Sequence, residues 1–289
     1  MTWPAILRSS VWLGIPNERL TNMKESKIEW TTHTFNPWIG CTKVSPGCAH
    51  CYAETLMDTR YGRVQWGKGN PRSRTSAGNW KQPKHWDKEA AKLGVRHRVF
   101  CASLADVFDG EVANEWRDDL WKLIEATPNL DWLLLTKRPE VMLSETRRLG
   151  VPENVWLGVS VEDQSRAEER IPTLIETDAA VKFLSVEPLL GALDLSYWLT
   201  EQIVPQLQWV IVGGESGPGA RTMKEEWVTP ILAECEAAGV AFLFKQWGGV
   251  DKHATGRTLN GTTYDALPTG RVARMPNTQV SHGEERTLK

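Results

Sequence analysis

The sequence predicts an α/β fold in which parallel strands form a partial or distorted (β/α) TIM-like barrel of about six to seven strands. Short runs rich in Val, Ile, Leu and Phe alternate with amphipathic stretches along most of the chain. The runs are apolar throughout, which is typical of parallel strands buried on both faces. Polar or charged residues follow each run at its carboxyl end. The runs occupy 98–106, 131–139, 155–163, 181–189, 208–216 and 241–249.

Helices are expected between these runs, and one further strand is expected before them. Apolar residues at i, i+3, i+4 and i+7 indicate amphipathic helices. Segment 33–38 adds a first strand and brings the number to about seven, which suits a partial barrel better than an open doubly wound sheet. The expected helices cover 112–126, 140–150, 163–176 and 225–239.

The chain divides into a central barrel and two flanking extensions. Residues 1–22 differ from the rest, and Met23 begins a segment typical of a natural start, so we expect an N-terminal extension or a loosely docked arm. The barrel covers 23–249 and contains a polar insertion around 62–97, which begins as an excursion loop rich in Gly, Arg and Lys. Residues 250–289 form a C-terminal extension that we expect to be partly disordered.

Composition indicates a soluble globular protein. Of the 289 residues, 41% are hydrophobic and 24% are charged, which is ordinary for that class. No apolar run approaches the roughly 18 residues of a membrane-spanning helix, and no signal peptide is recognised near the start. We therefore expect a cytoplasmic protein with no membrane partner. In that reducing compartment, clustered cysteines indicate a metal site or catalysis more than disulfides.

One segment departs from the overall charge balance. The net charge of −2 provides no overall basic field for nucleic acid. Segment 60–98 nevertheless holds many Lys and Arg residues, with Trp66, Trp80 and Trp86 between them. It is either a nucleic-acid surface or a solvated insertion with tryptophans packed beneath it, and the second interpretation is favoured.

Three cysteines lie close together in the segment NPWIGCTKVSPGCAHCYAE, where Cys41, Cys48 and Cys51 fall within eleven residues. A zinc site would need His33 or His50 as a fourth ligand, and structural zinc sites usually have a second ligand pair, which does not follow here. A 4Fe–4S cluster held by three thiolates would leave one iron open to a substrate or cofactor. A packed cluster of free thiols without function is the least favoured interpretation.

The polar residues at the strand ends would meet at one mouth of a barrel, where the active site of such folds lies. Any one of them can instead begin a loop or cap a helix, but their repetition after six strands favours a shared site. The other two cysteines, Cys101 in a strand and Cys235 in a helix, are expected to be small buried hydrophobic residues rather than further ligands. The strand-end residues are Ser103, Asp106, Lys137, Arg138, Ser160, Glu162, Ser185, Glu187, Glu215, Ser216, Lys245 and Gln246.

The three-cysteine loop after the first strand resembles that of the radical S-adenosylmethionine (SAM) enzymes. Their usual spacing is C-x3-C-x2-C, whereas this chain has C-x6-C-x2-C, with His50 where an aromatic residue is common and Tyr52 just after the third cysteine. More specifically, the chain is similar to a phage- and bacteria-associated family of uncharacterised radical-SAM-like proteins. The matching segments are NPWIGCTKVSPGCAHCYAE, LTKRP, VWLGVSVED, FLSVEPLLG, WVIVGGESGPGAR, FLFKQWGG and GRTLNGTTYDALP, from Trp30 to about Pro268.

The resemblance implies an enzyme with two cofactors, a 4Fe–4S cluster and SAM. Cys41, Cys48 and Cys51 would hold the cluster, and its open iron would bind the amino and carboxylate groups of SAM. One electron would cleave the sulfonium C–S bond and generate a 5′-deoxyadenosyl radical that abstracts hydrogen from an unidentified substrate, so that the cofactor does the difficult chemistry. A flavodoxin- or ferredoxin-like reductant protein is the expected partner.

Candidate residues for holding SAM follow from their positions after the strands. Ser103 and Asp106 are candidates for the methionine amine, and Ser160 and Glu162 for the ribose or the carboxylate. The turn at 213–215 has the letters of the Gly-Gly-Glu turn with which radical SAM enzymes bind the amine, but it follows a late strand. Its glycines would allow close approach of adenine or substrate, or would supply a loop that needs positive φ. The candidate cofactor-binding residues are Ser103, Asp106, Ser160, Glu162, Gly213, Gly214 and Glu215.

Further residues at the mouth are candidates for catalysis or substrate binding. Lys245 would act as a Schiff-base or acid–base lysine, or would pair with Glu215 or Glu187. Lys137–Arg138 would clamp a phosphate or carboxylate, or would pair with Asp106. The candidates are Lys137, Arg138, Glu187, Ser216, Arg221, Lys245 and Gln246.

More than one hypothesis is open for the substrate class and for the reaction. The basic segment 60–98 and the phage association favour a nucleotide or nucleic acid as substrate, whereas the slightly acidic composition counts against one. The rival functions are a zinc-binding, non-redox module for nucleic-acid binding or interaction, and a cluster-containing protein that has lost catalysis and acts in a complex.

Overall fold

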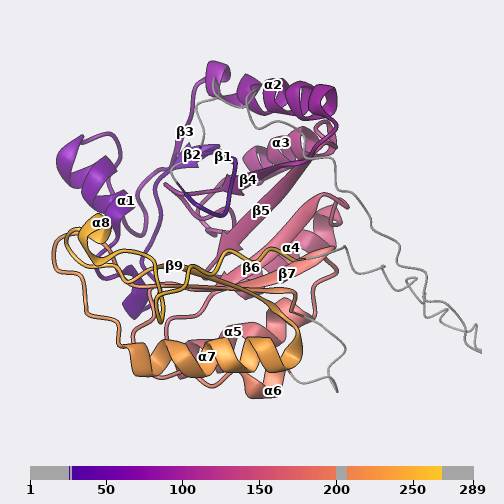
Figure 1. Ribbon diagram of the computed structural model, residues 1–289. Helices are drawn as coiled ribbons and strands as arrows, with labels where there is room; N and C mark the ends of the chain where they lie inside the picture. The colour runs from indigo at the N-terminus through magenta and orange to yellow at the C-terminus, as the bar shows by residue number, and fades with distance from the viewer. Residues whose placement is uncertain (1–25, 27, 200–206, 269–289) are drawn as a thin grey trace, which may run out of the picture.

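The computed structural model describes residues 26, 28–199 and 207–268. Seven parallel strands form one curled sheet, and helices flank it (Figure 1). The strands lie side by side in chain order, and a helix connects each one to the next, as in a (β/α) barrel. The predicted fold class, a partial (β/α) barrel, is confirmed. The expected N-terminal extension, 1–22, and residues 269–289 of the expected C-terminal extension, 250–289, lie outside the described residues.

All six apolar runs form strands of the sheet. The first strand, β1 (His33–Thr34), covers only two residues and pairs with β4. The rest of the expected strand at 33–38 leads into β2 (Trp38–Ile39), which pairs antiparallel with β3 (Ser73–Arg74) in a separate small sheet. The six long strands are β4 (His97–Cys101), β5 (Leu130–Thr136), β6 (Val155–Ser160), β7 (Val181–Val186), β8 (Trp209–Gly213) and β9 (Ala241–Gln246).

The four expected helices form close to their expected bounds, as α3 (Asn114–Glu125), α4 (Pro139–Leu149), α5 (Gln164–Ile175) and α7 (Glu225–Ala238). Asp163 caps α5 by accepting a hydrogen bond from the Arg166 amide at 2.9 Å. Within the described ranges, no helix combines the length and apolarity needed to cross a membrane. The short helices are η2 (Pro46–Cys48), α1 (Tyr52–Glu54), the π-helix η3 (Thr55–Arg60), α6 (Ser196–Leu199) and α8 (Lys252–Thr255).

Helix α2 (Ala77–Leu93) carries no clear sequence signal, although it connects the first strand of the sheet to β4. Only Pro83 and Ala90 are buried within it, and proline is normally disfavoured inside a helix. The helix contacts β4 and β5, and its Trp80 and Trp86 pack against the main core. The second part of the expected insertion is therefore a layer of the barrel, with tryptophans packed beneath it.

Side chains along each strand alternate between two apolar cores, as the two faces of a sheet require. One core lies between the sheet and the helices, and the other fills the inside of the curled sheet. In the inner core, the ring centroids of Phe100, Trp209 and Phe183 lie 4.7, 6.0 and 6.4 Å from that of Trp30. Gly158 makes room for them, because a Cβ there would lie 2.4 Å from the Phe183 ring.

The described part of the C-terminal extension covers the edge of the sheet at β9. The Phe244 amide donates to the Tyr264 carbonyl at 2.9 Å, and the Ala266 amide donates to the Phe242 carbonyl at 3.2 Å. The Trp209 indole also donates to the Ala266 carbonyl, at 2.9 Å. These bonds occupy backbone groups that an edge strand would otherwise leave free for another chain.

Candidate functional site

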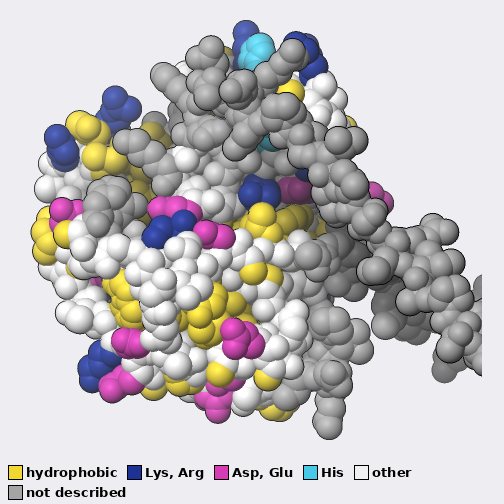
Figure 2. All heavy atoms as spheres, viewed as in Figure 1, with side chains coloured by type: hydrophobic (Ala, Val, Ile, Leu, Met, Phe, Trp, Pro, Cys, Tyr) yellow, Lys and Arg dark blue, Asp and Glu magenta, His cyan; other side chains and the backbone are white. Residues whose placement is uncertain are grey.

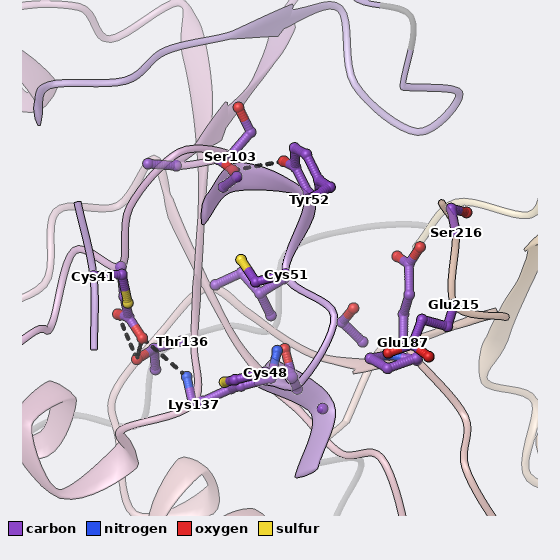
Figure 3. Close-up of a pocket in the computed structure, with 18 of the residues that line it drawn as sticks. Cys41, Cys48, Cys51, Tyr52, Ser103, Thr136, Lys137, Glu187, Glu215 and Ser216 are labelled. Carbon is purple, nitrogen blue, oxygen red and sulfur yellow. Dashed lines mark hydrogen bonds between the residues drawn. The ribbon is translucent and has the colours of Figure 1, made fainter. Parts of the chain in front are cut away.

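A cavity of about 580 Å³ lies at the carboxyl ends of the strands, and most of the predicted site residues line it (Figure 3). Its volume is within the ~300–1,000 Å³ of typical ligand sites. The three loop cysteines are all on its wall. The other predicted residues on the wall are Ser103, Asp106, Lys137, Arg138, Ser160, Ser185, Glu187, Gly214, Glu215, Ser216, Lys245 and Gln246.

The three cysteines come from three different local structures. Cys41 follows β2, Cys48 ends η2, and Cys51 is the residue before α1. All three are partly buried and free of disulfides. Burial raises the pKa of Cys41 to about 12 and also raises the pKa of Cys51. At Cys41, Asp106 adds to the rise, whereas Arg138, with Nη1 3.5 Å from the sulfur, opposes it. A metal or cluster must therefore displace protons to bind here.

Glu162 lies behind the wall and holds the cysteine loop. Its fully buried side chain pairs with Arg170 of α5, with Nη1 2.8 Å from Oε2. The other oxygen accepts hydrogen bonds from the Ser45 hydroxyl and, at 3.3 Å, from the Gly47 amide. A Cβ on Gly47 would lie 2.9 Å from this oxygen. Glu162 is thus placed to fix the backbone just before Cys48, and it is not among the residues that line the cavity.

Asp106 organises the mouth beside the first cysteine. It accepts hydrogen bonds from the Thr136 hydroxyl at 2.7 Å, the Lys137 amide at 3.2 Å and the Arg138 guanidinium at 2.7 Å. Burial acts to lower the pKa of Arg138, but Asp106 and then Cys41 raise it overall, so this side chain stays charged. In the part of the chain that the structure describes, the Lys137 ammonium has no ion pair, which leaves its charge available to an anion.

Two further ion pairs cross the mouth. Lys245 pairs with Glu187, with Nζ 2.6 and 2.8 Å from the two carboxylate oxygens, which is one of the partners expected for it. Glu215 pairs with Arg221 at 2.5 Å and with His50 Nδ1 at 3.0 Å. Burial acts to raise the pKa of Glu215, but the hydrogen bonds from Arg221 and His50 outweigh it and lower the pKa to about 2. Glu215 is therefore ionised at neutral pH.

The Gly-Gly-Glu turn brings two neighbouring loops together. A Cβ on Gly214 would lie 1.9 Å from the Trp247 carbonyl oxygen, and a Cβ on Gly248 would lie 2.3 Å from that of Glu215. The close approach that these glycines allow is therefore between the loops after β8 and β9. Gly213 lies within β8 and is not on the cavity wall.

Ser103 is held by two residues that the sequence analysis does not single out as functional. The Tyr52 hydroxyl donates to its carbonyl at 2.5 Å, and the Asn36 side-chain amide donates to its hydroxyl at 3.1 Å. Both partners flank the cysteines in the segment 36–54. Their position in that segment is the only signal that indicates them.

The side chains that the structure describes do not form a ready-made site for a single metal ion. Among the described residues, no three His, Cys, Asp or Glu side chains are close enough to hold one ion. His33 lies apart from the cysteines, stacked on Trp86 with ring centroids 4.3 Å apart and hydrogen-bonded to His97 at 3.2 Å. Ligands of one zinc ion must all lie about 2.0–2.3 Å from it, whereas the cysteines of a cluster each bind a different iron.

The two remaining cysteines do not join the other three. Cys101 and Cys235 are fully buried in the main core. Burial raises the pKa of both thiols, that of Cys235 to about 12. Their surroundings agree with the expectation that they are small buried hydrophobic residues.

Comparison with known proteins identifies the family. The family model described as "Protein of unknown function (DUF5131)" matches residues 25–268, and the chain belongs to this family. No curated protein sequence matches. Among solved structures, the chain is similar to a variant of spore photoproduct lyase with bound AdoMet and dinucleoside spore photoproduct (TM-score 0.44) and to spore photoproduct lyase complexed with dinucleoside spore photoproduct (TM-score 0.42). Each is 13% identical over 75% of this chain and 64% of that chain, so the match spans less than two thirds of those chains.

Proposed function

We propose that this member of the DUF5131 family is a radical SAM enzyme that holds a 4Fe–4S cluster through Cys41, Cys48 and Cys51. One observation carries the proposal: three partly buried, disulfide-free thiols line one large cavity at the carboxyl ends of the strands. Three thiolate ligands leave one iron of such a cluster open. The resemblance of the C-x6-C-x2-C loop to radical SAM loops supports the same assignment.

When bound, the cluster and SAM supply the one-electron cleavage of a C–S bond and the hydrogen abstraction that follows. The chain binds and orients SAM. Lys137, whose ammonium has no ion pair among the described residues, is the candidate partner for the SAM carboxylate. Ser160 and Ser185 are paired neighbours on β6 and β7 and line the cavity, where their hydroxyls suit the ribose.

The chain also shields the reaction and adjusts the cysteine ligands. Trp30, Phe100 and Leu135 supply apolar wall to the cavity, which limits the entry of water to the reacting groups. Arg138 donates to the Cys41 sulfur at 3.5 Å. Hydrogen bonds to ligand sulfurs influence the reduction potential of a cluster, so Arg138 is assigned to the ligand rather than to the substrate.

The proposal extends to the substrate, the electron donor and the location. A nucleotide or nucleic acid is the substrate class that the basic segment 60–98 favours. A flavodoxin- or ferredoxin-like protein would supply the electron. A cytoplasmic location agrees with five free cysteines, because a reducing compartment keeps thiols reduced.

Anaerobic reconstitution with iron and sulfide tests the proposal. We expect a brown protein whose electron paramagnetic resonance signal, after reduction with dithionite, changes when SAM is added. Cys41→Ala should abolish the signal, whereas Cys235→Ala, which removes a thiol in the main core, should retain it. A colourless protein that binds one zinc ion through the same three cysteines would contradict the proposal.

A further inference from the structure

A short exposed segment beside the cavity presents an aromatic ring between two arginines. Residues 60–63, the arm tip, begin at the last residue of the π-helix η3, and Tyr61 is 52% exposed. The guanidinium carbons of Arg60 and Arg63 each lie 5.6 Å from the centroid of the Tyr61 ring. Figure 2 shows Lys and Arg side chains beside hydrophobic ones at the end of the molecule where α1 lies. Cations and an aromatic face are therefore presented together to solvent.

The charges of the arm tip are not used within the protein. Across the described ranges, neither Arg60 nor Arg63 forms an ion pair, and nor does the exposed Lys68 nearby. The nearest carboxylate in sequence, Asp58, accepts a hydrogen bond from the Trp66 amide at 2.7 Å. Three unpaired cations within nine residues form a local positive patch on a chain whose net charge is −2.

A packed base supports the arm tip. Met57, Val64 and Trp66 are buried together with Ala53 in a small apolar cluster. The Arg63 amide donates to the Met57 carbonyl at 2.8 Å. The tip is thus presented by a folded element, so ligand binding would order little additional backbone.

A second cavity, with Arg60 of the arm tip in its wall, lies beside the main one. This cavity of about 230 Å³ is lined by Arg60, Leu56 and Pro218, and it shares His50, Tyr52 and Ser216 with the main cavity. The Tyr52 side chain is 53% exposed and adds a second accessible aromatic ring to this path. The shared lining residues place a ligand that binds at Arg60 next to the wall of the main cavity.

We propose that the arm tip binds single-stranded nucleic acid and directs one nucleotide through the second cavity into the main cavity. Single strands are bound by cationic grooves that follow the phosphates and by aromatic rings on which unpaired bases stack. Arg60 and Arg63 supply the first feature, and Tyr61 and Tyr52 supply the second. An acidic peptide would match the charge but would leave the exposed rings without a stacking partner. Delivery of a nucleotide to the reaction rests on the proposed function, whereas binding of the single strand at the arm tip does not.

Fluorescence anisotropy with labelled single-stranded DNA and RNA of about 12 nucleotides tests the inference on the reconstituted protein. Arg60→Gln with Arg63→Gln should weaken binding at least about tenfold and reduce the slope of log K against log salt by about 0.7 for each phosphate that is no longer neutralised. Tyr61→Leu should weaken binding by a similar factor without changing the slope. The control, Lys122→Gln with Arg147→Gln, removes two exposed cations of α3 and α4, outside segment 60–98, and should leave the affinity unchanged.

Several results would overturn the inference. They are the absence of binding at low salt, an equal loss of affinity in the control variant, or equally effective competition by poly-glutamate, which would indicate an acidic polypeptide. Repeating the titration with Cys41→Ala separates this inference from the proposed function. If the wild-type protein binds the single strand but forms no cluster, only the enzyme proposal is contradicted. If it forms a cluster that responds to SAM but does not bind the single strand, only the arm-tip proposal is contradicted.

Discussion

Single side chains at the cavity mouth are already paired within the protein. Arg138 pairs with Asp106 at 2.7 Å, and Lys245 pairs with Glu187 at 2.6 Å. For both basic residues, the sequence left open a ligand-binding role and an ion pair, because either role suits a charge at a strand end. Removing one member of a buried pair leaves the other charge uncompensated, so variants here would report on folding as well as on binding.

His33 gives a pH-dependent prediction at the same scale. Burial, assisted by His97, lowers its pKa from 6.5 to about 4, so folding favours the neutral ring. The resulting stability is fully present above pH 6.5 and is lost as the pH falls towards 4, because the unfolded chain then binds a proton that the folded chain does not. The loss should be up to about 3 kcal/mol. Urea unfolding at several pH values between 4.5 and 7 measures it.

The His33→Gln variant should show a flatter dependence of stability on pH over that window. His85→Gln is the matched control, because His85 lies on the exposed side of α2 and should leave the wild-type slope unchanged. An equal slope in wild type and His33→Gln would show that other groups cause the pH dependence.

At the scale of elements, the cysteine loop is attached to three separate parts of the barrel. Glu162, two residues after β6, accepts a hydrogen bond from the Gly47 amide, and Arg221 of the loop after β8 donates to the Pro46 carbonyl at 3.0 Å. Arg138 after β5 donates to the Thr42 carbonyl at 2.6 Å. A loop with little regular structure is thereby held in place by residues that follow three different strands.

Glu162→Gln tests this attachment. The amide keeps the size of the side chain but leaves the buried Arg170 charge unpaired, so we expect destabilisation of about 3 kcal/mol. We also expect a lower iron content per chain after reconstitution, because the backbone next to Cys48 is released. Urea unfolding and iron analysis, made under conditions in which the variant is folded, measure the two effects separately.

The matched control is Glu176→Gln, which removes one partner of the exposed Arg147–Glu176 pair. Exposed pairs contribute about 0–1 kcal/mol, and this variant should retain the wild-type iron content. A folded Glu162→Gln protein with full iron content would show that Glu162 supports the barrel but does not position the cysteines.

For the whole molecule, the cavity is built from the ends of many strands. Its wall includes Cys41 near the start of the barrel, Ser160 and Glu187 in the middle, and Gln246 at the end of the last strand. A ligand that contacts all of these parts binds the folded state only, so its binding energy adds to the stability of the entire barrel.

SAM should therefore raise the melting temperature of the reconstituted protein. At a concentration 100 times its dissociation constant, the added stability is about 2.7 kcal/mol, which corresponds to a shift of roughly 5 °C for a chain of this size. Differential scanning fluorimetry under anaerobic conditions measures the shift. Cys41→Ala should show a much smaller one, and equal shifts in the two proteins would mean that SAM binds without the cluster.

The sequence by itself determined the order and kind of most elements. The six long strands and helices α3, α4, α5 and α7 have local patterns, because burial on both faces requires continuous apolar runs and burial of one face requires a helical period. The three cysteines and most of the cavity wall were also predictable, since parallel strands bring their carboxyl ends to one edge. Helix α2 was not predictable, because it contains Pro83 and its few buried residues give no helical period of apolar positions.

Only the tertiary structure decided which side chains contact one another. Glu162 reaches Gly47 across 115 positions of sequence, and Arg138 reaches the Cys41 sulfur across 97. His33, a candidate zinc ligand by proximity in sequence, stacks on Trp86 instead. Ion pairs and hydrogen bonds depend on distances of a few ångströms through space, and no local pattern of residue types encodes those distances. The periodicity of helices and strands, in contrast, follows from each residue and its near neighbours. The sequence therefore determines which helices and strands carry the site residues, but not the contacts between those residues.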